Sequence, residues 1–329
     1  MVTVVVPVFN GERTIEPCIR RILSQSIRPF EVVVVDDCST DETPVILGRL
    51  SHKYSKLVVL RNKENLGKAA SVTSALSQVR SPFTAIVDSD TYLERDYLKK
   101  TLGAFLREEI AGVSGMVLPS ETDTAVSRSR LIEYLHGQST YKKLRTRMGV
   151  SFVSPGCCSI WRTDWIKRNG VPAETVVEDM DLTWEAQADG NTIAYVPDAI
   201  AYTEEPETFK RYLKQIGRWF SWRPVLEKHA KDMTNWLKLV VSLIFVESIG
   251  YLFWLGLMLS FLLTGKYLLA IILFSMDLVV VLAVSLFQGF KIRLPLREVL
   301  LAVPYYYLLR IPTVLMFWKS LISPKRAGW

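Results

Sequence analysis

Cysteine is scarce in this sequence, and its placement excludes two common ways of stabilising a fold. The 329 residues include four cysteines, Cys18, Cys38, Cys157 and Cys158, and no Cys-x-x-Cys spacing of the kind that zinc sites use. The adjacent Cys157 and Cys158 are a poor disulfide pair, so the sequence favours a reducing compartment. We expect neither structural zinc nor a disulfide framework.

A secretory leader is also missing from the start of the sequence. The apolar run over residues 2–8 is too short for a signal segment, and it runs into the turn Pro7-Val8-Phe9-Asn10 without a basic leader or a small-residue cleavage site. We therefore expect the N-terminal part of the protein to lie in the cytosol.

Apolar residues are in excess, and the excess lies in the last third of the sequence. The composition is 49% hydrophobic, which is more than a soluble domain of this length needs. Residues 239–263, 267–288 and 299–322 are each long enough to cross a hydrocarbon core of about 30 Å as a helix. We expect residues 239–329 to form a membrane region with two to three transmembrane segments, because prolines and an arginine favour a kinked or re-entrant third segment.

Positive charge is concentrated directly before the first of these runs. The formal net charge is +7, and its location fits anionic lipid headgroups better than nucleic acid. We therefore expect no nucleic-acid partner, and amphipathic interface helices over residues 204–238. The basic residues concerned are Lys210, Arg211, Lys214, Arg218, Arg223, Lys228, Lys231 and Lys238.

The connections between the apolar runs carry unequal charge. Lysine and arginine make residues 291–297 basic, whereas residues 264–266 are nearly free of charge. The positive-inside rule therefore places the basic connection on the cytosolic side. Three crossings would leave Lys325 and Arg326 on the opposite side, against the same rule, so the topology of the third segment stays open.

Three ionisable side chains lie within the apolar runs, namely Glu247, Asp277 and Arg310. Charges at membrane depth are costly unless they meet one another. We expect Arg310 to pair with Glu247 or with Asp277, either as internal packing or as a polar lining.

Residues 1–203 have a different pattern, in which β-branched runs alternate with amphipathic stretches. This alternation predicts an α/β domain with a Rossmann-like, doubly wound and mainly parallel sheet. Ligands of such sheets bind beyond the C-terminal ends of the strands. The expected strands are residues 3–8, 32–35, 57–60, 84–87 and 112–118, and the expected helices include residues 14–25 and 97–106.

Polar clusters follow three of these strands. They are the segment from Pro7 to Glu12, the segment from Asp36 to Asp41, and Asp88-Ser89-Asp90. One such cluster often does no more than cap a helix or make a turn. Three clusters at the same sheet edge, two of them with paired acids, favour a ligand site.

The Asp88-Ser89-Asp90 cluster has the donor atoms of a divalent-cation site. Hard carboxylate oxygens suit Mg²⁺ or Mn²⁺, which keep coordination positions open for phosphate oxygens. A diphosphate leaving group needs such neutralisation of its charge. The position of the cluster at a strand end therefore predicts a metal site.

Two more motifs lie downstream. Glu178 and Asp179 precede an expected helix, where the helix dipole alone also favours acids. As a functional group one of them, with Asp179 preferred, could take a proton from an acceptor hydroxyl. In Gln215-x-x-Arg218-Trp219 the arginine could clamp a pyrophosphate and the tryptophan could stack on a sugar. The alternative is an interfacial helix with an aromatic belt, from which Arg218 snorkels.

In this order, and together with Gly67-Lys68-Ala69, the motifs resemble those of membrane-bound family-2 glycosyltransferases. The closest pattern is that of the hyaluronan, cellulose, chitin and poly-N-acetylglucosamine synthases, and the resemblance covers residues 1–222. It implies a GT-A fold, a UDP-sugar donor, a divalent metal, and inversion at the anomeric carbon by a single displacement.

The resemblance also implies roles for individual residues. Asp179 is the implied general base, with Glu178 beside it, and Asp90 binds the metal with Asp88. Two departures from the pattern stand out: Gly11 separates Asn10 from Glu12, which weakens the role of Glu12, and Cys38 replaces a common glycine in a turn. The implied donor contacts are Pro7, Asn10, Glu12, Asp37, Lys68, Asp88, Ser89, Gln215 and Arg218, and the implied acceptor contacts are Trp219, Gly156 and Cys157.

Three functions stay open at this point. The first is a membrane-embedded transferase that adds a sugar to a growing glycan or a lipid-linked acceptor at the cytosolic face. The second is a single-addition lipid glycosyltransferase with a polyprenyl-phosphate or glycolipid acceptor, because two or three crossings are few for a polysaccharide channel unless subunits combine as a homo-oligomer. The third is a non-catalytic nucleotide-sugar sensor, against which the intact Asp90 and Asp179 argue.

Overall fold

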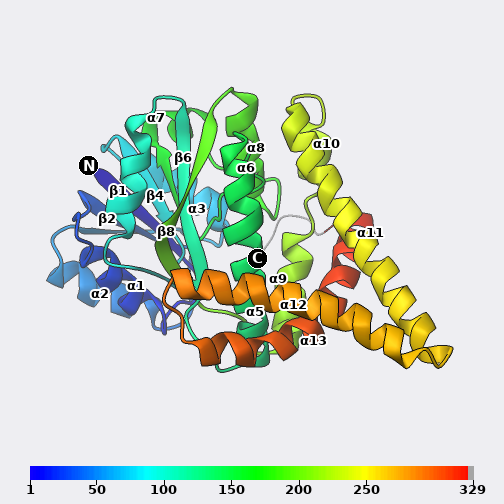
Figure 1. Cartoon of the computed structure of the whole chain (residues 1–329). Helices are drawn as coiled ribbons and strands as arrows, with labels where there is room; N and C mark the ends of the chain where they lie inside the picture. Colours follow the sequence, from blue (N-terminus) through cyan, green and yellow to red (C-terminus); the bar gives the residue numbers. More distant parts are fainter. Residues whose placement is uncertain (325–329) are drawn as a thin grey trace.

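The computed structural model describes residues 1–324, apart from the side chains of residues 139, 140 and 147. Lys325 and Arg326, on which one expectation about the tail rested, lie outside the described residues. Figure 1 shows an α/β domain with a set of long helices packed along one side of it.

One mixed sheet forms the centre of the α/β domain. Its strands span Val2–Val8 (β1), Glu31–Asp36 (β2), Leu57–Arg61 (β3), Phe83–Val87 (β4), Thr91–Leu93 (β5), Ile110–Pro119 (β6), Cys158–Arg162 (β7) and Thr192–Thr203 (β8). Their order across the sheet is β3-β2-β1-β4-β7-β6-β8-β5. The pairs among β1 to β4 are parallel, as is β6 with β8, whereas β7 and β5 run antiparallel to their neighbours. The predicted doubly wound α/β fold is confirmed, with the antiparallel pairs confined to the second half of the sheet.

Helices cover both faces of the sheet because successive valines of β1 point to opposite sides. Val4 and Val6 belong to a core with α1 (Ile15–Leu23), α2 (Thr43–Lys53) and α4 (Tyr97–Leu102). Val5 belongs to a second core with α3 (Lys68–Leu76), α7 (Thr163–Asn169) and α8 (Glu178–Ala188). The expected helix over residues 97–106 is α4 followed by a 3-10 turn, Gly103–Leu106.

Shorter helices connect this domain to the long apolar ones. They are α5 (Ala125–His136), a π-helical segment (Gly137–Lys142), α6 (Lys143–Arg147), α9 (Phe209–Trp219) and α10 (Arg223–His229). The hydroxyl of Thr124 accepts a 3.0 Å hydrogen bond from the Ser127 N–H and so caps α5. Buried Asp181 on α8 accepts hydrogen bonds from Lys228 Nζ at 2.9 Å and His229 Nε2 at 2.6 Å, which fasten α10 to the domain.

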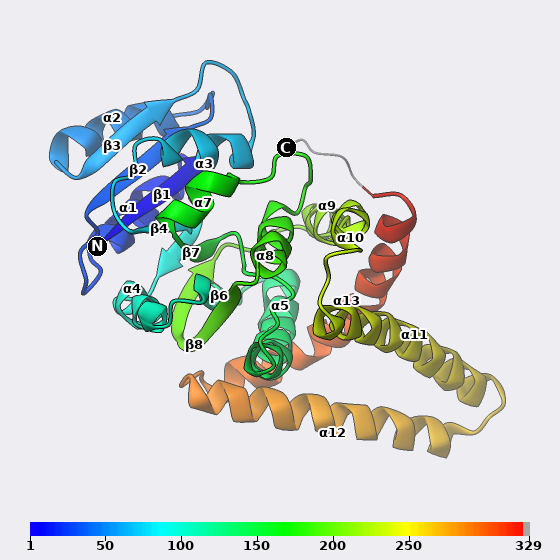
Figure 2. The ribbon, with the colours of Figure 1, turned by 90° about the horizontal axis from the view of Figure 1, so that it is seen from above.

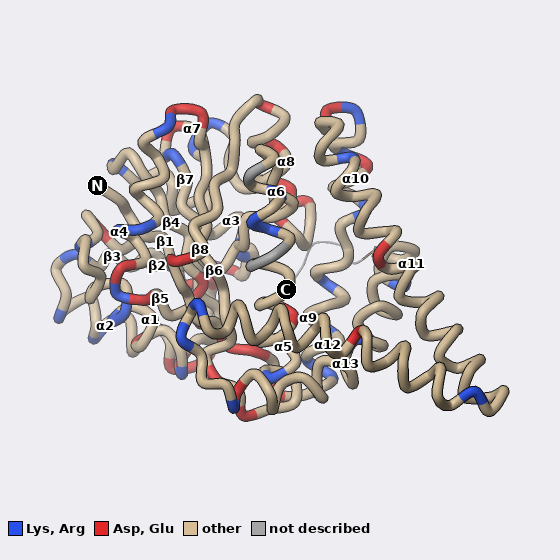
Figure 3. Tube along the Cα trace, in the orientation of Figure 1, with Lys and Arg blue, Asp and Glu red and all other residues tan. Residues whose placement is uncertain are grey.

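The last part of the described chain consists of α11 (Asn235–Leu263), α12 (Tyr267–Lys291) and α13 (Leu296–Ile322), each long and apolar enough to cross a membrane. Figure 3 shows few charges along α11 and α12 between their ends. α13 continues through Pro304 and Pro312 as one helix, and it packs against α5 and α9. Seen from above, α12 runs alongside the α/β domain next to α5, while α11 extends away from it (Figure 2).

An ion pair joins two of the apolar helices. Arg310 Nη1 of α13 lies 3.5 Å from Asp277 Oδ2 of α12, and the Tyr307 hydroxyl donates to the same oxygen at 2.6 Å. The Arg310 guanidinium also lies 4.2 Å from the centre of the Tyr251 ring. The expectation that Arg310 meets an acid at this depth is therefore confirmed for Asp277. Glu247 has no ion pair with it among the described side chains.

Candidate active site

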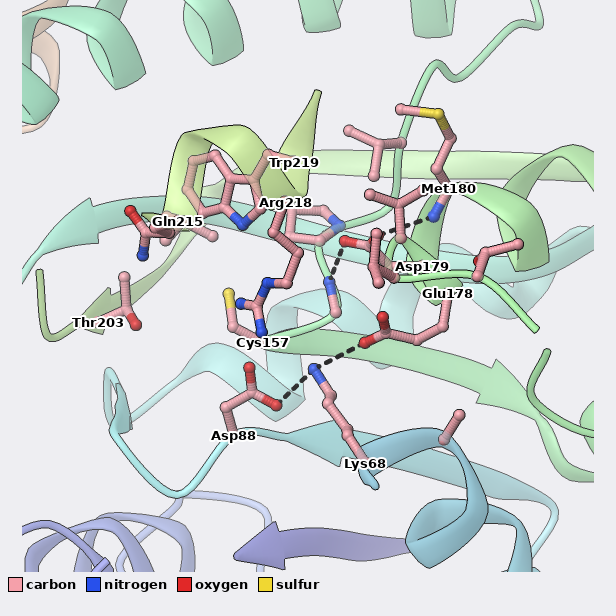
Figure 4. A pocket seen from close by; sticks show the side chains of 18 of the residues that line it. Lys68, Asp88, Cys157, Glu178, Asp179, Met180, Thr203, Gln215, Arg218 and Trp219 are labelled. Atoms are coloured by element: carbon pink, nitrogen blue, oxygen red, sulfur yellow. Dashed lines mark hydrogen bonds and ion pairs between the residues drawn. The ribbon is translucent and has the colours of Figure 1, made fainter. Parts of the chain in front are cut away.

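Most of the predicted site residues open onto one cavity of about 1020 Å³ (Figure 4). The adjacent parallel strands β1 and β4 end at the same sheet edge, so the polar residues that follow them meet there. The first turn of α8 and one side of α9 complete the wall. The predicted residues that line the cavity are Pro7, Asn10, Lys68, Asp88, Ser89, Asp90, Gly156, Cys157, Glu178, Asp179, Gln215, Arg218 and Trp219.

Lys68 links two of the carboxylates. Its Nζ atom lies 2.7 Å from Asp88 Oδ1 and 3.3 Å from Glu178 Oε1, as the dashed lines of Figure 4 show. Burial works against the ammonium form, but the charges of Asp88 and Glu178 prevail and raise the pKa of Lys68 well above its usual value. Lys68 is therefore a fixed cation that holds the end of β4 against the start of α8.

The surroundings of Asp90 disfavour its ionised form. Burial and the charge of Asp88 raise the pKa of Asp90 to about 7, although Lys68 opposes the rise. Two carboxylates confined in one cavity are stabilised together by a bound cation. Among residues 1–324 there is no group of three or more His, Cys, Asp or Glu residues able to hold a metal.

Asp179 is oriented by backbone donors. Its Oδ2 atom accepts a 2.9 Å hydrogen bond from the Gly156 N–H, and its Oδ1 atom accepts one of 2.8 Å from the Met180 N–H. A Cβ atom on Gly156 would lie 3.2 Å from Cβ of Asp179 and 2.9 Å from Lys68 Nζ, so the close approach favours glycine. Burial and the charge of Glu178 raise the pKa of Asp179 to about 6, against the effect of Lys68.

A buried arginine supports the Gln215-x-x-Arg218-Trp219 motif on α9. Arg130 on α5 donates from Nη2 to Gln215 Oε1 at 2.9 Å, and its guanidinium lies 4.5 Å from the centre of the Trp219 ring. Arg130 also pairs with Glu133 at 2.5 Å and with Glu205 at 3.4 Å. Gln215 and Trp219 are therefore held by one cation, while Arg218 points towards Asp88 and Cys157 (Figure 4).

The sequence model described as Glycosyl transferase family 2 matches residues 3–170, which is half of the chain. The chain belongs to glycosyl transferase family 2. The matched part contains the ends of β1 and β4 and the start of α3, which supply Asn10, Asp88, Asp90 and Lys68 to the cavity. α8 and α9 lie beyond the matched residues.

Curated relatives are similar to this chain over about two thirds of its length. The chain is 28% identical over 233 residues to the N-acetylglucosaminyltransferase of Azorhizobium caulinodans, covering 66% of this chain and 58% of that one. It is 26% identical over 226 residues to the uncharacterized glycosyltransferase YaiP of Escherichia coli, covering 65% and 54%. It is 21% identical over 220 residues to the poly-beta-1,6-N-acetyl-D-glucosamine synthase of Staphylococcus aureus, covering 66% and 53%. The chain thus spans little more than half the length of these relatives.

Solved structures show the same GT-A fold. The mannosyltransferase PcManGT from Pyrobaculum calidifontis, in complex with GDP-Man and Mn²⁺, has a TM-score of 0.64 at 18% identity and covers 98% of this chain and 87% of that chain. TarS 1-349 of S. aureus in complex with UDP-GlcNAc has a TM-score of 0.51 at 23% identity and covers 71% and 68%. At these identities the likeness concerns the fold alone.

Two residues expected at the donor lie outside the cavity wall, Glu12 and Asp37. The Asp37 carboxylate is buried and accepts hydrogen bonds from Asn62 Nδ2 at 2.7 Å, Leu66 N at 2.9 Å and Gly67 N at 2.8 Å. Glu12 accepts from the Glu42 N–H at 3.1 Å. Their carboxylates hold neighbouring loops in place, and their contact with the nucleotide stays a prediction.

Cys38, which replaces a common glycine of the pattern, adopts a backbone conformation that glycine favours. Cys38 adopts a φ of 63°, in the left-handed region that favours glycine. Its thiol donates to the Lys63 carbonyl at 3.6 Å, which fixes the turn after β2.

Sequence reasoning missed the cations that α5, the π-helical segment and α6 bring to the site. Arg130 supports α9, and Lys142 and Arg145 line the cavity. One local signal was available, because Arg130 and Glu133 form an i,i+3 pair on α5. No short sequence motif connects Lys142 or Arg145 with Asp88 and Asp90, the acids after β4.

Proposed function

We propose that this family-2 glycosyltransferase moves a sugar from a UDP-sugar to a hydroxyl of a glycan or lipid-linked acceptor at the cytosolic face of a membrane. The observation that carries the proposal is that one cavity is lined both by the acids Asp90 and Asp179 and by Ile244 of α11 and Phe317 of α13. A relative named for poly-N-acetylglucosamine synthesis and a structural neighbour that binds UDP-GlcNAc support the donor class. The basic segment before α11 supports the cytosolic side.

The proposed transfer is a single displacement. The acceptor oxygen forms a bond to the anomeric carbon while the bond from that carbon to the β-phosphate oxygen breaks. The hydroxyl proton passes to Asp179, and the electron pair of the broken bond leaves with UDP. Attack opposite the leaving group inverts the anomeric centre. Arg218 and the amide of Gln215 would hold the diphosphate, and Trp219 would border the acceptor.

The acids after β4 fit a divalent cation. Asp88 and Asp90 offer hard oxygen donors, and the charge of Asp88 adds to burial in raising the pKa of Asp90. We propose that Asp90 and Asp88 hold Mg²⁺ or Mn²⁺. When bound, the ion would neutralise charge that develops on the diphosphate.

Removing Asp90 tests the metal site. Asp90→Ala is expected to lower kcat/KM for Mn²⁺-stimulated UDP release by about 100-fold or more, because the ion loses a carboxylate ligand. Release of UDP from a panel of UDP-sugars, and of GDP from GDP-mannose, would be measured with and without Mn²⁺. Asp198→Ala removes an exposed acid that does not line the cavity and is expected to behave as the unsubstituted protein. Donor-stimulated release that ignores both Mn²⁺ and Asp90 would contradict the metal-assisted mechanism.

Product size separates polymer synthesis from single addition. Membranes incubated with a labelled donor would give a ladder of labelled chains in the first case, and a single labelled lipid in the second. The apolar part of the cavity wall favours an acceptor that reaches the site from the membrane.

A further inference from the structure

The wall of the cavity has an apolar part built by both the α/β domain and the apolar helices. The rings of Phe152 and Trp222 lie 5.7 Å apart, and Trp222 lies 6.1 Å from Phe317 of α13. Ile244 of α11 belongs to the same hydrophobic cluster. All four residues line the cavity that holds Asp179. A bound molecule could therefore contact the acids and the apolar helices together.

Besides Arg218, which is proposed to hold the donor diphosphate, two cations line this cavity without a carboxylate partner among the described side chains, Lys142 and Arg145. Lys142 Nζ donates to the Ser114 hydroxyl at 3.0 Å and lies 4.7 Å from the centre of the Tyr195 ring. The Arg145 guanidinium lies 5.8 Å from the centre of the Phe152 ring. Neither has a carboxylate oxygen within 4.0 Å among the side chains described, in contrast to Lys68, which has two.

Such cations are unfavourable unless an anion joins them. Burial lowers the pKa of Lys142 to about 8, although Cys158, Cys157 and Asp179 act in the opposite direction. Burial likewise lowers the pKa of Arg145, with Glu247 and Tyr141 opposing the shift from outside ion-pair distance. Contacts with aromatic rings offset only part of the desolvation. An anionic ligand would supply the missing partner.

The position of these cations favours the acceptor over the donor. Arg218 points towards Asp88, where the diphosphate of the donor is proposed to bind (Figure 4). Lys142 lies against Ser114 and Tyr195, and Arg145 lies against Phe152 of the apolar part. An anion bound here would sit between Asp179 and the hydrocarbon wall.

We propose that Lys142 and Arg145 bind the phosphate of a lipid-linked sugar acceptor, whose hydrocarbon chain lies against Phe317 and Ile244. This proposal rests on the proposed sugar transfer and names the class of its acceptor. The acceptor sugar hydroxyl would then face Asp179. The phosphate would lie between Asp179 and the side chains of α11 that line the cavity. Phosphate recognition by an arginine and a lysine together supplies charge-assisted hydrogen bonds that a neutral acceptor cannot make.

The test compares two acceptors that carry the same sugar, a polyprenyl-diphosphate-linked N-acetylglucosamine and a neutral alkyl N-acetylglucosaminide, with the full chain in detergent micelles and the donor found in the panel above. The expected KM for the diphosphate lipid is at least tenfold lower than for the neutral glycoside. Lys142→Met and Arg145→Met are each expected to raise the KM for the diphosphate lipid about tenfold or more. Lys142→Arg should retain most of the preference. Lys143→Met, in the same segment but outside the cavity wall, is the control.

Calorimetry of UDP binding in the presence of Mn²⁺ measures donor binding independently of the acceptor. The proposal expects Lys142→Met and Arg145→Met to bind UDP as the unsubstituted protein does. Equal KM values for the two acceptors, or a preference that survives both substitutions, would overturn the acceptor assignment. Loss of UDP binding in both variants would assign the cations to the donor and overturn it too. Failure of the proposed function has a different signature, because the unsubstituted protein would then release no UDP from any donor.

Discussion

Asp179→Asn is expected to lower kcat by about 100- to 10,000-fold, the usual contribution of a positioned general base. Asparagine preserves the size of the side chain and can still accept from the Gly156 N–H, which now bonds to Asp179 at 2.9 Å. The expected loss therefore concerns the proton acceptor rather than the fold. Initial rates of sugar transfer and UDP binding by calorimetry would be measured on the same preparations, and binding is expected to stay within about twofold.

The pH profile gives this prediction a second readout. Burial and the charge of Glu178 raise the pKa of Asp179 to about 6. The base acts only when ionised, so kcat/KM should fall about tenfold per pH unit below pH 6 and level off above it. Glu178→Gln removes a negative neighbour, lowers the pKa of Asp179, and should move the acid limb to lower pH.

Glu185→Gln is the matched control for these substitutions, because Glu185 lies on the same helix, outside the cavity wall, and pairs with Lys228 at 3.6 Å. Its profile should overlay that of the unsubstituted protein. Unchanged turnover in Asp179→Asn would contradict the base assignment and return the non-catalytic sensor to consideration. An acid limb that stays in place in Glu178→Gln would show that another group controls the pH dependence.

The sequence predicts the local features of the site well because they depend on short segments. Apolar runs that end in acids predict both the strands and the polar edge after them, and Asp88 and Asp90 line the cavity as this reasoning requires. The three apolar runs likewise appear as α11, α12 and α13, each within a few residues of the expected bounds. The hydrophobic periodicity and the length of a segment are enough to predict such elements.

Features that depend on contacts between residues far apart in the sequence could not be predicted from local patterns. Asp37 follows β2 as Asp88 follows β4, yet it turns inward because the loop at residues 62–67 supplies three donors to it. Strands β5, β7 and β8 were missed. β5 and β7 span only three and five residues, and Pro197 and Asp198 interrupt the apolar pattern of β8. The cations at the site were missed because their neighbours are far away in sequence, as with Arg130 and Gln215, which are 85 positions apart.

Arg130→Met is expected to damage both stability and activity, since this one side chain holds four partners. Its guanidinium is only 4% exposed, and it neutralises Glu205, which is 2% exposed, while holding Gln215 and Trp219. Removing one member of a buried ionic cluster costs about 3 to 5 kcal/mol. We expect a lower thermal midpoint in detergent, and a kcat about 10- to 100-fold lower because α9 loses its positioning contact.

A double substitution separates the two effects. Burial raises the pKa of Glu205 while Arg130 opposes that rise, so the carboxylate left behind in Arg130→Met is the main source of instability. Arg130→Met with Glu205→Gln removes the orphaned charge and keeps an acceptor for the Tyr134 hydroxyl, which now donates to Glu205 at 2.6 Å. The thermal midpoint should largely recover, whereas kcat should stay low because Gln215 and Trp219 still lack their anchor. Recovery of kcat together with stability would assign Arg130 to the fold alone, and would mean that α9 keeps its active geometry through its contacts with α13.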